Sequence, residues 1–104
     1  MAKYEVYRNP NPRSRGDAPY LLDVQAEVFR TMSSRVVVPL YREAVIPKPM
    51  RVLQPSLTVE GATVVMDTLA IVGLPVRSLG ERVGDLSSDS ATILAALDLM
   101  LTGA

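Results

Sequence analysis

Residues 87–104 read SSDSATILAALDLMLTGA, and this stretch decides how the chain is organised. Between residues 91 and 101 only Thr92 and Asp98 interrupt an apolar run rich in Ala, Leu and Met, which are strong helix formers. The composition therefore predicts a C-terminal helix. A helix of about a dozen residues is too short to cross a bilayer, which takes roughly 20 residues, so no membrane association is expected.

Signals at both ends support the predicted helix. Ser87, Ser88 and Asp89 offer side-chain oxygens to the free amides of the first turn, and the charge of Asp89 suits a helix N-terminus. At the other end, Gly103 can adopt the left-handed conformation that stops many helices.

The apolar surface of the predicted helix is wider than a single core-facing stripe. One face carries Ile93, Ala96, Leu97 and Met100, and other sides carry Leu94, Leu99 and Leu101. We expect one side to pack on the chain's own sheet and another to contact a second protein. The alternative is that the helix is buried on all sides by its own domain.

Composition limits the chemistry that the chain can perform. A length of 104 residues predicts a single domain, residues 1–104. The absence of Cys and His removes thiolate nucleophiles, the usual general base and the commonest metal ligands. We therefore expect no catalytic residues, no metal and no cofactor. The start, MAKYEVYR, does not resemble a signal peptide, so a cytoplasmic location is expected.

Charge is unevenly distributed although the net charge is zero. Residues 1–51 hold nine Lys or Arg and five acids, and residues 52–104 hold two and six, so the halves carry +4 and −4. A basic surface for phosphate or an acidic partner would follow if the fold gathers these residues, but solvated loops are the commoner cause. No basic-aromatic repeat accompanies the charge, so direct nucleic-acid contact is not predicted.

Polarity patterns and turn residues predict about five antiparallel strands before the helix, which is an α+β, mostly β or small-barrel arrangement. The loop at residues 9–19 is rich in Pro, and Glu60-Gly61 suits a tight hairpin between the longest strands. Pro39 should lie at a strand end or edge. The predicted strands span residues 3–8, 20–29, 34–40, 52–59 and 62–72, and residues 73–87 are assigned to turns.

In the second predicted strand, alternation places Asp23 and Glu27 on a face that meets water or a partner. Residues four apart on a strand lie roughly 13 Å apart, which is too far for a catalytic carboxylate pair.

In order along the chain, these pieces resemble the CcdB toxin family of bacterial type II toxin–antitoxin modules. The stretches that carry the resemblance cover nearly the whole chain: YEVY at residues 4–7, LDVQ at 22–25, RVVVPL at 35–40, Pro55 with Leu57, Val59 and Gly61, Met66 with Thr68 and Ala70, LGE at 79–81 with Val83, DLS at 85–87, and Leu99-Met100 before Gly103.

The resemblance implies a twisted, partly barrel-like antiparallel sheet with the C-terminal helix packed on it, in a homodimer. It also implies a protein that is not an enzyme. Family members poison DNA gyrase by binding its gyrase A component, and a disordered CcdA-like antitoxin wraps the dimer and releases the target. DNA would be contacted only through the antitoxin complex, which represses its own operon.

The resemblance also implies where partners bind. The family's chain end, Trp-Gly-Ile, carries the gyrase contact and corresponds here to Thr102, Gly103 and Ala104, following Leu101. Only the glycine matches, so we expect weak gyrase binding.

Antitoxin contacts are implied at the end of the second strand and on the helix. The corresponding residues here are Val28, Phe29 and Asp98. The alternative is that Val28, Phe29 and Leu101 are ordinary core residues.

Two other functions stay open. MazF-type toxins resemble CcdB in fold but cut messenger RNA, and Arg35 with Ser33 and Ser34 would be the candidates for such chemistry here. The chain could also be a toxin relic that binds its antitoxin and represses its operon without poisoning gyrase.

Overall fold

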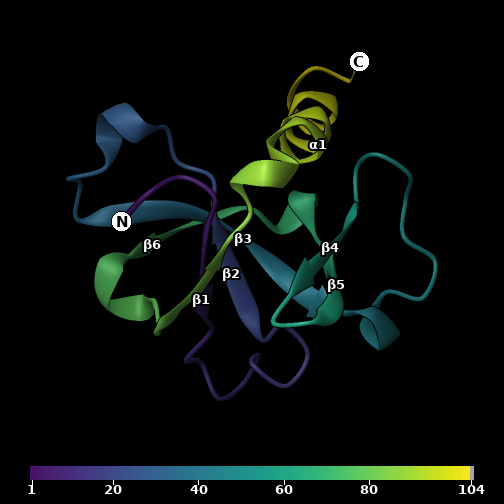
Figure 1. Ribbon diagram of the computed structural model, residues 1–104, viewed down its shortest axis with the longest axis horizontal. Helices are drawn as coiled ribbons and strands as arrows, with labels where there is room; N and C mark the ends of the chain where they lie inside the picture. Colours follow the sequence, from purple (N-terminus) through teal and green to yellow (C-terminus); the bar gives the residue numbers. More distant parts are fainter. Residues whose placement is uncertain (104) are drawn as a thin grey trace.

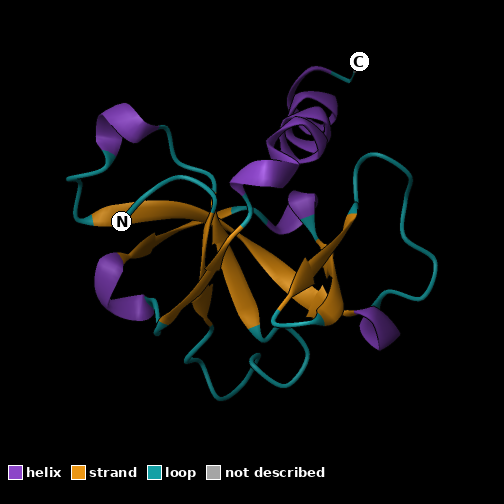
Figure 2. Ribbon diagram, in the orientation of Figure 1, coloured by secondary structure: helices purple, strands orange, loops and turns teal. Residues whose placement is uncertain are grey.

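The structure is a computed structural model that describes residues 1–103. Within them, seven strands form one antiparallel sheet, and a helix follows at the C-terminal end (Figures 1 and 2). The strands are β1 Glu5–Arg8, β2 Tyr20–Asp23, β3 Ser34–Arg42, β4 Ser56–Val59, β5 Ala62–Met66, β6 Val72–Pro75 and β7 Arg82–Asp85, and the helix is α1 Ser90–Thr102. Short 3-10 helices lie between them: η1 Glu27–Phe29, η2 Glu43–Val45, η3 Thr68–Ala70, η4 Val76–Ser78 and η5 Ser87–Asp89.

Strand β3 is the centre of the sheet. The order is β4-β5-β3-β2-β1-β7, and β6 also pairs with β3. On one side β3 pairs with β2, and on the other side its two halves pair with different strands, Leu40 with Met66 of β5 and Val37 with Val72 of β6. Because β5 and β6 lie along one side of β3, the sheet curls into a half-barrel (Figure 1). The predicted fold class is confirmed.

Several strand predictions need correction. Residues assigned to turns form the short strands β6 and β7, each with a glycine inside it, so the sheet has seven strands and not five. The longest strand is β3, with 9 residues, and not one of the hairpin strands. A short glycine-containing stretch becomes a strand because a neighbour completes its hydrogen-bond ladder, and this cannot be read from local sequence.

Strand β2 ends at Asp23, six residues before the predicted end. The Asp23 carboxylate accepts a hydrogen bond from the Gln25 amide at 3.0 Å, the local bond with which Asp favours turns. Asp23 itself is fully buried, so its predicted position facing water or a partner is wrong.

Pro39 lies within β3 and not at an end or edge of the strand. Its carbonyl accepts a bond from the Asp67 amide at 3.1 Å, at the point where β5 has ended and β6 has not begun. In an antiparallel strand the nitrogen and the carbonyl of one residue face the same side. The missing N–H of Pro39 therefore faces a break in the pairing, where no strand needs it.

One face of the sheet forms the core. Val6, Leu22 and Leu40 of the sheet pack with the β4–β5 hairpin and with α1, which buries Ile93, Ala96 and Leu97. At the start of α1, Asp89 makes no side-chain capping bond; instead the Asp85 carboxylate accepts from the Ser87 amide at 2.7 Å. The predicted stop is confirmed, because Gly103 has φ 73° and its amide bonds to the Leu99 carbonyl.

The predicted β4–β5 hairpin turn is also confirmed, with positive φ at Glu60 and Gly61. The Glu60 carboxylate accepts hydrogen bonds from the Tyr20 hydroxyl at 2.6 Å and from Arg8 at 3.0 Å. The bond from Tyr20, with help from the charge of Arg8, lowers the pKa of Glu60 below its ordinary value. This turn therefore tethers the hairpin to β1 and β2.

Gly80 is required by a close backbone approach. A Cβ at this position would lie 2.6 Å from the Arg8 carbonyl oxygen, to which the Gly80 amide donates a hydrogen bond. At Gly84 in β7, a Cβ would meet nothing within 4 Å.

We expect Gly80→Ala to destabilise the fold by about 1–3 kcal/mol, because β1 and the chain before β7 must separate to admit the methyl group. Gly84→Ala is the matched control and should change stability by about 0.5 kcal/mol or less. Urea unfolding of both variants measures the difference. Equal effects would show that the close approach is not rigid.

Candidate partner-binding surfaces

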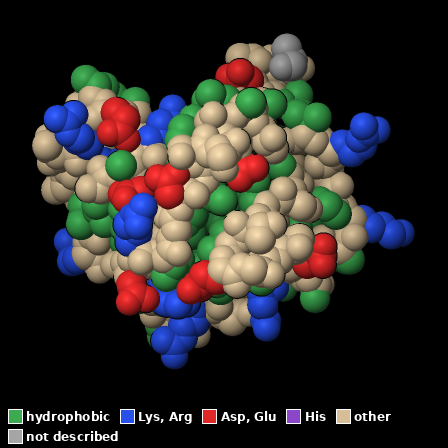
Figure 3. Space-filling model, in the orientation of Figure 1, with side chains coloured by type: hydrophobic (Ala, Val, Ile, Leu, Met, Phe, Trp, Pro, Cys, Tyr) green, Lys and Arg blue, Asp and Glu red, His purple; other side chains and the backbone are tan. Residues whose placement is uncertain are grey.

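The outer side of α1 is apolar and exposed. Leu94 and Leu101 face away from the sheet, and Leu101 is 74% exposed. η3 packs against α1 and leaves Leu69 exposed beside the helix. We call Leu69, Leu94 and Leu101 the helix surface, and Figure 3 shows hydrophobic side chains around α1 at the top of the view. Burial of the helix on all sides by its own domain is therefore excluded.

The end of α1 holds Asp98 of the predicted antitoxin site and Thr102 of the predicted target site. Asp98 and Thr102 are exposed, and the Thr102 hydroxyl donates to the Asp98 carbonyl at 2.7 Å. Gly103 ends the helix, whereas Ala104 lies outside the described residues.

A second apolar surface lies on η1 and the turn after it. Val28 is 77% exposed, Phe29 is 53% exposed, and Met32 is exposed beside them. These three residues form the η1 surface. The alternative that Val28, Phe29 and Leu101 are core residues is wrong. Sequence reasoning missed Met32, whose only signal is an apolar side chain within a polar stretch.

Buried polar groups hold the η1 surface from beneath. Arg35 forms an ion pair with Asp23 at 2.6 Å, and both side chains are 0% exposed. Arg35 also donates to the Phe29 carbonyl at 3.2 Å, and the Gln25 side chain donates to the same oxygen at 2.9 Å. The Val36 amide donates to Gln25 in turn. These bonds hold the Phe29 carbonyl toward the interior, while the Phe29 side chain faces outward.

The polar network extends to β1 on the same face of the sheet. Burial raises the pKa of Tyr7, and its hydrogen bond to Glu5 at 2.8 Å raises it further. The charge of Asp23 acts in the same direction, and that of Arg35 opposes it. Tyr7 therefore stays neutral and donates to Glu5 across the physiological pH range.

The candidate ribonuclease residues do not form an accessible site. Ser33 and Ser34 are exposed, but Arg35 is fully buried and neutralised by Asp23. A guanidinium in this position cannot reach a phosphate in solvent.

The helix surface and the η1 surface lie apart on the molecule. In Figure 1, η1 is at the upper left and the end of α1 is at the top right of centre. The predicted antitoxin residues are therefore divided within one chain, with Val28 and Phe29 on one surface and Asp98 near the other.

Two kinds of site are not found in the described part of the chain. None of its helices is both long and apolar enough to cross a membrane. Across residues 1–103, no three His, Cys, Asp or Glu side chains are grouped so that they could hold a metal ion.

The half-barrel, its single C-terminal helix and the order of its strands define the fold class of the protein. The chain belongs to the CcdB family: residues 3–103 match the family described as CcdB protein. Among solved structures it is similar to an endoribonuclease in complex with its cognate antitoxin from mycobacterial species. The match has a TM-score of 0.77 at 19% identity and covers 97% of this chain and 94% of that chain.

We predict that Arg35→Met destabilises the protein by about 3–5 kcal/mol, because Asp23 is left buried and unpaired. Nη2 of Arg35 is already buried without a hydrogen-bond partner among residues 1–103, so the pair is not fully satisfied. The double variant Asp23→Leu with Arg35→Met should recover much of the loss.

Unfolding in urea measures the stability of both variants, and hydrogen exchange reports on η1. The double variant should regain stability while the amides of residues 26–33 exchange faster than in the unmodified protein, since Phe29 has lost the bond from Arg35. Unchanged exchange would mean that Arg35 does not hold η1.

Proposed function

We propose that this chain is the toxin of a bacterial type II toxin–antitoxin module, that it acts in the cytoplasm through protein contacts, and that it is not an enzyme. Membership of the CcdB family supports a toxin with an antitoxin partner. The similar solved structure is also a complex with a cognate antitoxin. The observation that carries the proposal is the helix surface, where apolar side chains are exposed on a helix whose other side is already in the core.

The proposed partners use different surfaces. A second copy of the chain packs on Leu69 and Leu94 of the helix surface to form a homodimer and leaves Leu101 to the target, since symmetric pairing covers apolar area that one small domain leaves exposed. The disordered CcdA-like antitoxin binds Val28 and Phe29 of the η1 surface and Asp98. The gyrase A component of DNA gyrase is the proposed target, bound by the chain end at residues 101–104, and the DNA of its own operon is contacted only through the antitoxin complex.

Expression of this chain alone should arrest bacterial growth, and co-expression of the reading frame immediately upstream should restore it. We expect weak poisoning of gyrase, because Thr102 replaces a tryptophan that is worth about 2 kcal/mol or more at an interface, or roughly thirtyfold in affinity. Thr102→Trp with Ala104→Ile should increase binding to gyrase A and the trapping of cleaved DNA. The readouts are growth, gyrase cleavage assays and, in parallel, incubation with RNA.

The same assays separate the alternatives. Absence of growth arrest together with antitoxin binding would indicate a relic. Cleavage of RNA without trapped gyrase would replace the gyrase proposal with an endoribonuclease. Trapping of gyrase by the unmodified protein at nanomolar concentration would show that the chain end does not set its potency.

Val28→Ala and Phe29→Ala should each weaken antitoxin binding without lowering the stability of the fold, because both side chains are exposed. Val45→Ala, at an exposed valine of η2, is the matched control and should bind normally. Calorimetry with the purified antitoxin should show a large negative heat-capacity change, as expected for a disordered segment that folds on binding. Equal weakening by Val45→Ala would contradict the assignment of the η1 surface.

A further inference from the structure

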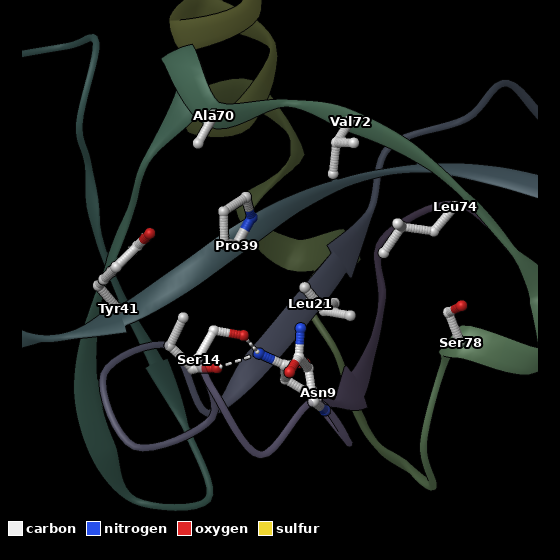
Figure 4. A pocket seen from close by; sticks show the side chains of 11 residues that line it. Asn9, Ser14, Leu21, Pro39, Tyr41, Ala70, Val72, Leu74 and Ser78 are labelled. Atoms are coloured by element: carbon white, nitrogen blue, oxygen red, sulfur yellow. Dashed lines mark hydrogen bonds between the residues drawn. The ribbon is translucent and has the colours of Figure 1, made fainter.

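A pocket of about 270 Å³ opens on the face of the sheet opposite α1 (Figure 4). Leu21 and Pro39 form its floor, since their side chains alternate with Leu22 and Leu40, which face the core. The loop at residues 9–19 forms one wall, and residues 70–78 form the other. The pocket shares no residue with the helix surface or the η1 surface.

Hydrogen bonds within the loop at residues 9–19 preorganise the wall that it forms. Asn9 is buried, and its side-chain amide donates to the Ser14 hydroxyl and to the Ala18 carbonyl, both at 2.9 Å. Its side-chain oxygen accepts from the Asn11 amide at 3.1 Å. Both polar side-chain atoms of Asn9 are thereby used inside the loop, so Asn9 shapes the pocket and leaves recognition to its neighbours.

The pocket offers polar groups above an apolar floor. The hydroxyls of Tyr41 and Ser78 line it at opposite ends of the view in Figure 4, and neither has a hydrogen-bond partner within residues 1–103. An apolar slot with a few convergent hydrogen-bonding groups is typical of a small-ligand site. Its volume lies below the roughly 300–1,000 Å³ of sites for drug-sized ligands, so it suits a group about the size of one nucleic-acid base.

The segments around the pocket carry unpaired positive charge. The segments that supply the two walls, residues 9–19 and 70–78, carry Arg13, Arg15 and Arg77 against the single acid Asp17, all of them outside the lining itself. All three arginines are exposed, and none forms an ion pair with any residue from 1 to 103. Arg8 of β1, by contrast, is paired with Glu60 and Glu81. Unpaired guanidinium groups are suited to phosphate.

We propose that this pocket binds single-stranded nucleic acid, with one unstacked base above Leu21 and Pro39 and the flanking phosphates on Arg13, Arg15 and Arg77. Tyr41 and Ser78 hydrogen-bond the edges of the base. A duplex is excluded, because its bases are stacked and cannot enter the slot. This site is independent of the proposed toxin function, since its lining shares no residue with the helix surface or the η1 surface.

Fluorescence anisotropy with labelled single-stranded RNA and DNA oligonucleotides of one mixed sequence tests the proposal. Binding should weaken as salt rises, and Arg13→Gln with Arg15→Gln should lower the salt slope by about 1 for each phosphate contact removed. Arg30→Gln, at an exposed arginine of the turn after η1, is the matched control and should leave binding unchanged. Comparison of the two affinities shows whether the pocket prefers RNA or DNA.

A second variant tests the slot itself. Ala70→Leu adds bulk to the wall at a partly exposed position, so it should preserve the fold by circular dichroism while lowering affinity by about tenfold, because the narrowed slot no longer admits the base. Unchanged affinity in Ala70→Leu, an equal loss in Arg30→Gln, or equal binding of duplex DNA would overturn the proposal. So would displacement of the oligonucleotide by polyglutamate at equal charge, which would mark a site for acidic peptides.

Discussion

The buried ion pair between Asp23 and Arg35 is the interaction on which the arrangement of this fold depends. It joins the end of β2 to the start of β3, at the place where β3 also begins its pairing with β6. Removing two charges from water is costly, and the cost is offset only where the geometry and additional bonds are good. Here those bonds run to the Gln25 amide and the Phe29 carbonyl, so the same pair that joins the strands also positions the η1 surface.

The curled sheet places the helix surface and the pocket on opposite faces. On one face, α1 and the β4–β5 hairpin complete the core, and only the outer side of the helix is left for a partner. On the other face no helix of comparable length packs within residues 1–103; the loop at residues 9–19 and residues 70–78 cover it and leave the pocket between them. A loop cannot fill the space above a sheet as evenly as a helix does, because its side chains do not repeat along one face. The pocket is a consequence of that difference.

Local chemistry was sufficient to predict some elements, namely α1, its stop at Gly103 and the hairpin at Glu60-Gly61. Each of these follows from a run of helix formers or from a residue that tolerates positive φ. The burial of Asp23 could not be predicted, because alternation places a polar residue toward water unless a partner charge is known to lie across the sheet. The predictions for Pro39 and for the residues of β6 and β7 were wrong for the same reason, since pairing between distant segments of the chain decides these features.

The candidate sites differ in the same way: local sequence predicts some of their residues, and contacts between distant segments decide the others. Leu94 and Leu101 of the helix surface were visible in the sequence because they lie on one continuous element with a known period, whereas Leu69 on η3 was not predicted. The η1 surface was indicated by the family resemblance alone, since the bonds from Arg35 and Gln25 to the Phe29 carbonyl have no signal in the local sequence. The pocket had no sequence signal, because its lining comes from β2, β3, the loop at residues 9–19 and residues 70–78. Exposed apolar groups on two separate surfaces are better explained by partners that cover them than by packing within one chain.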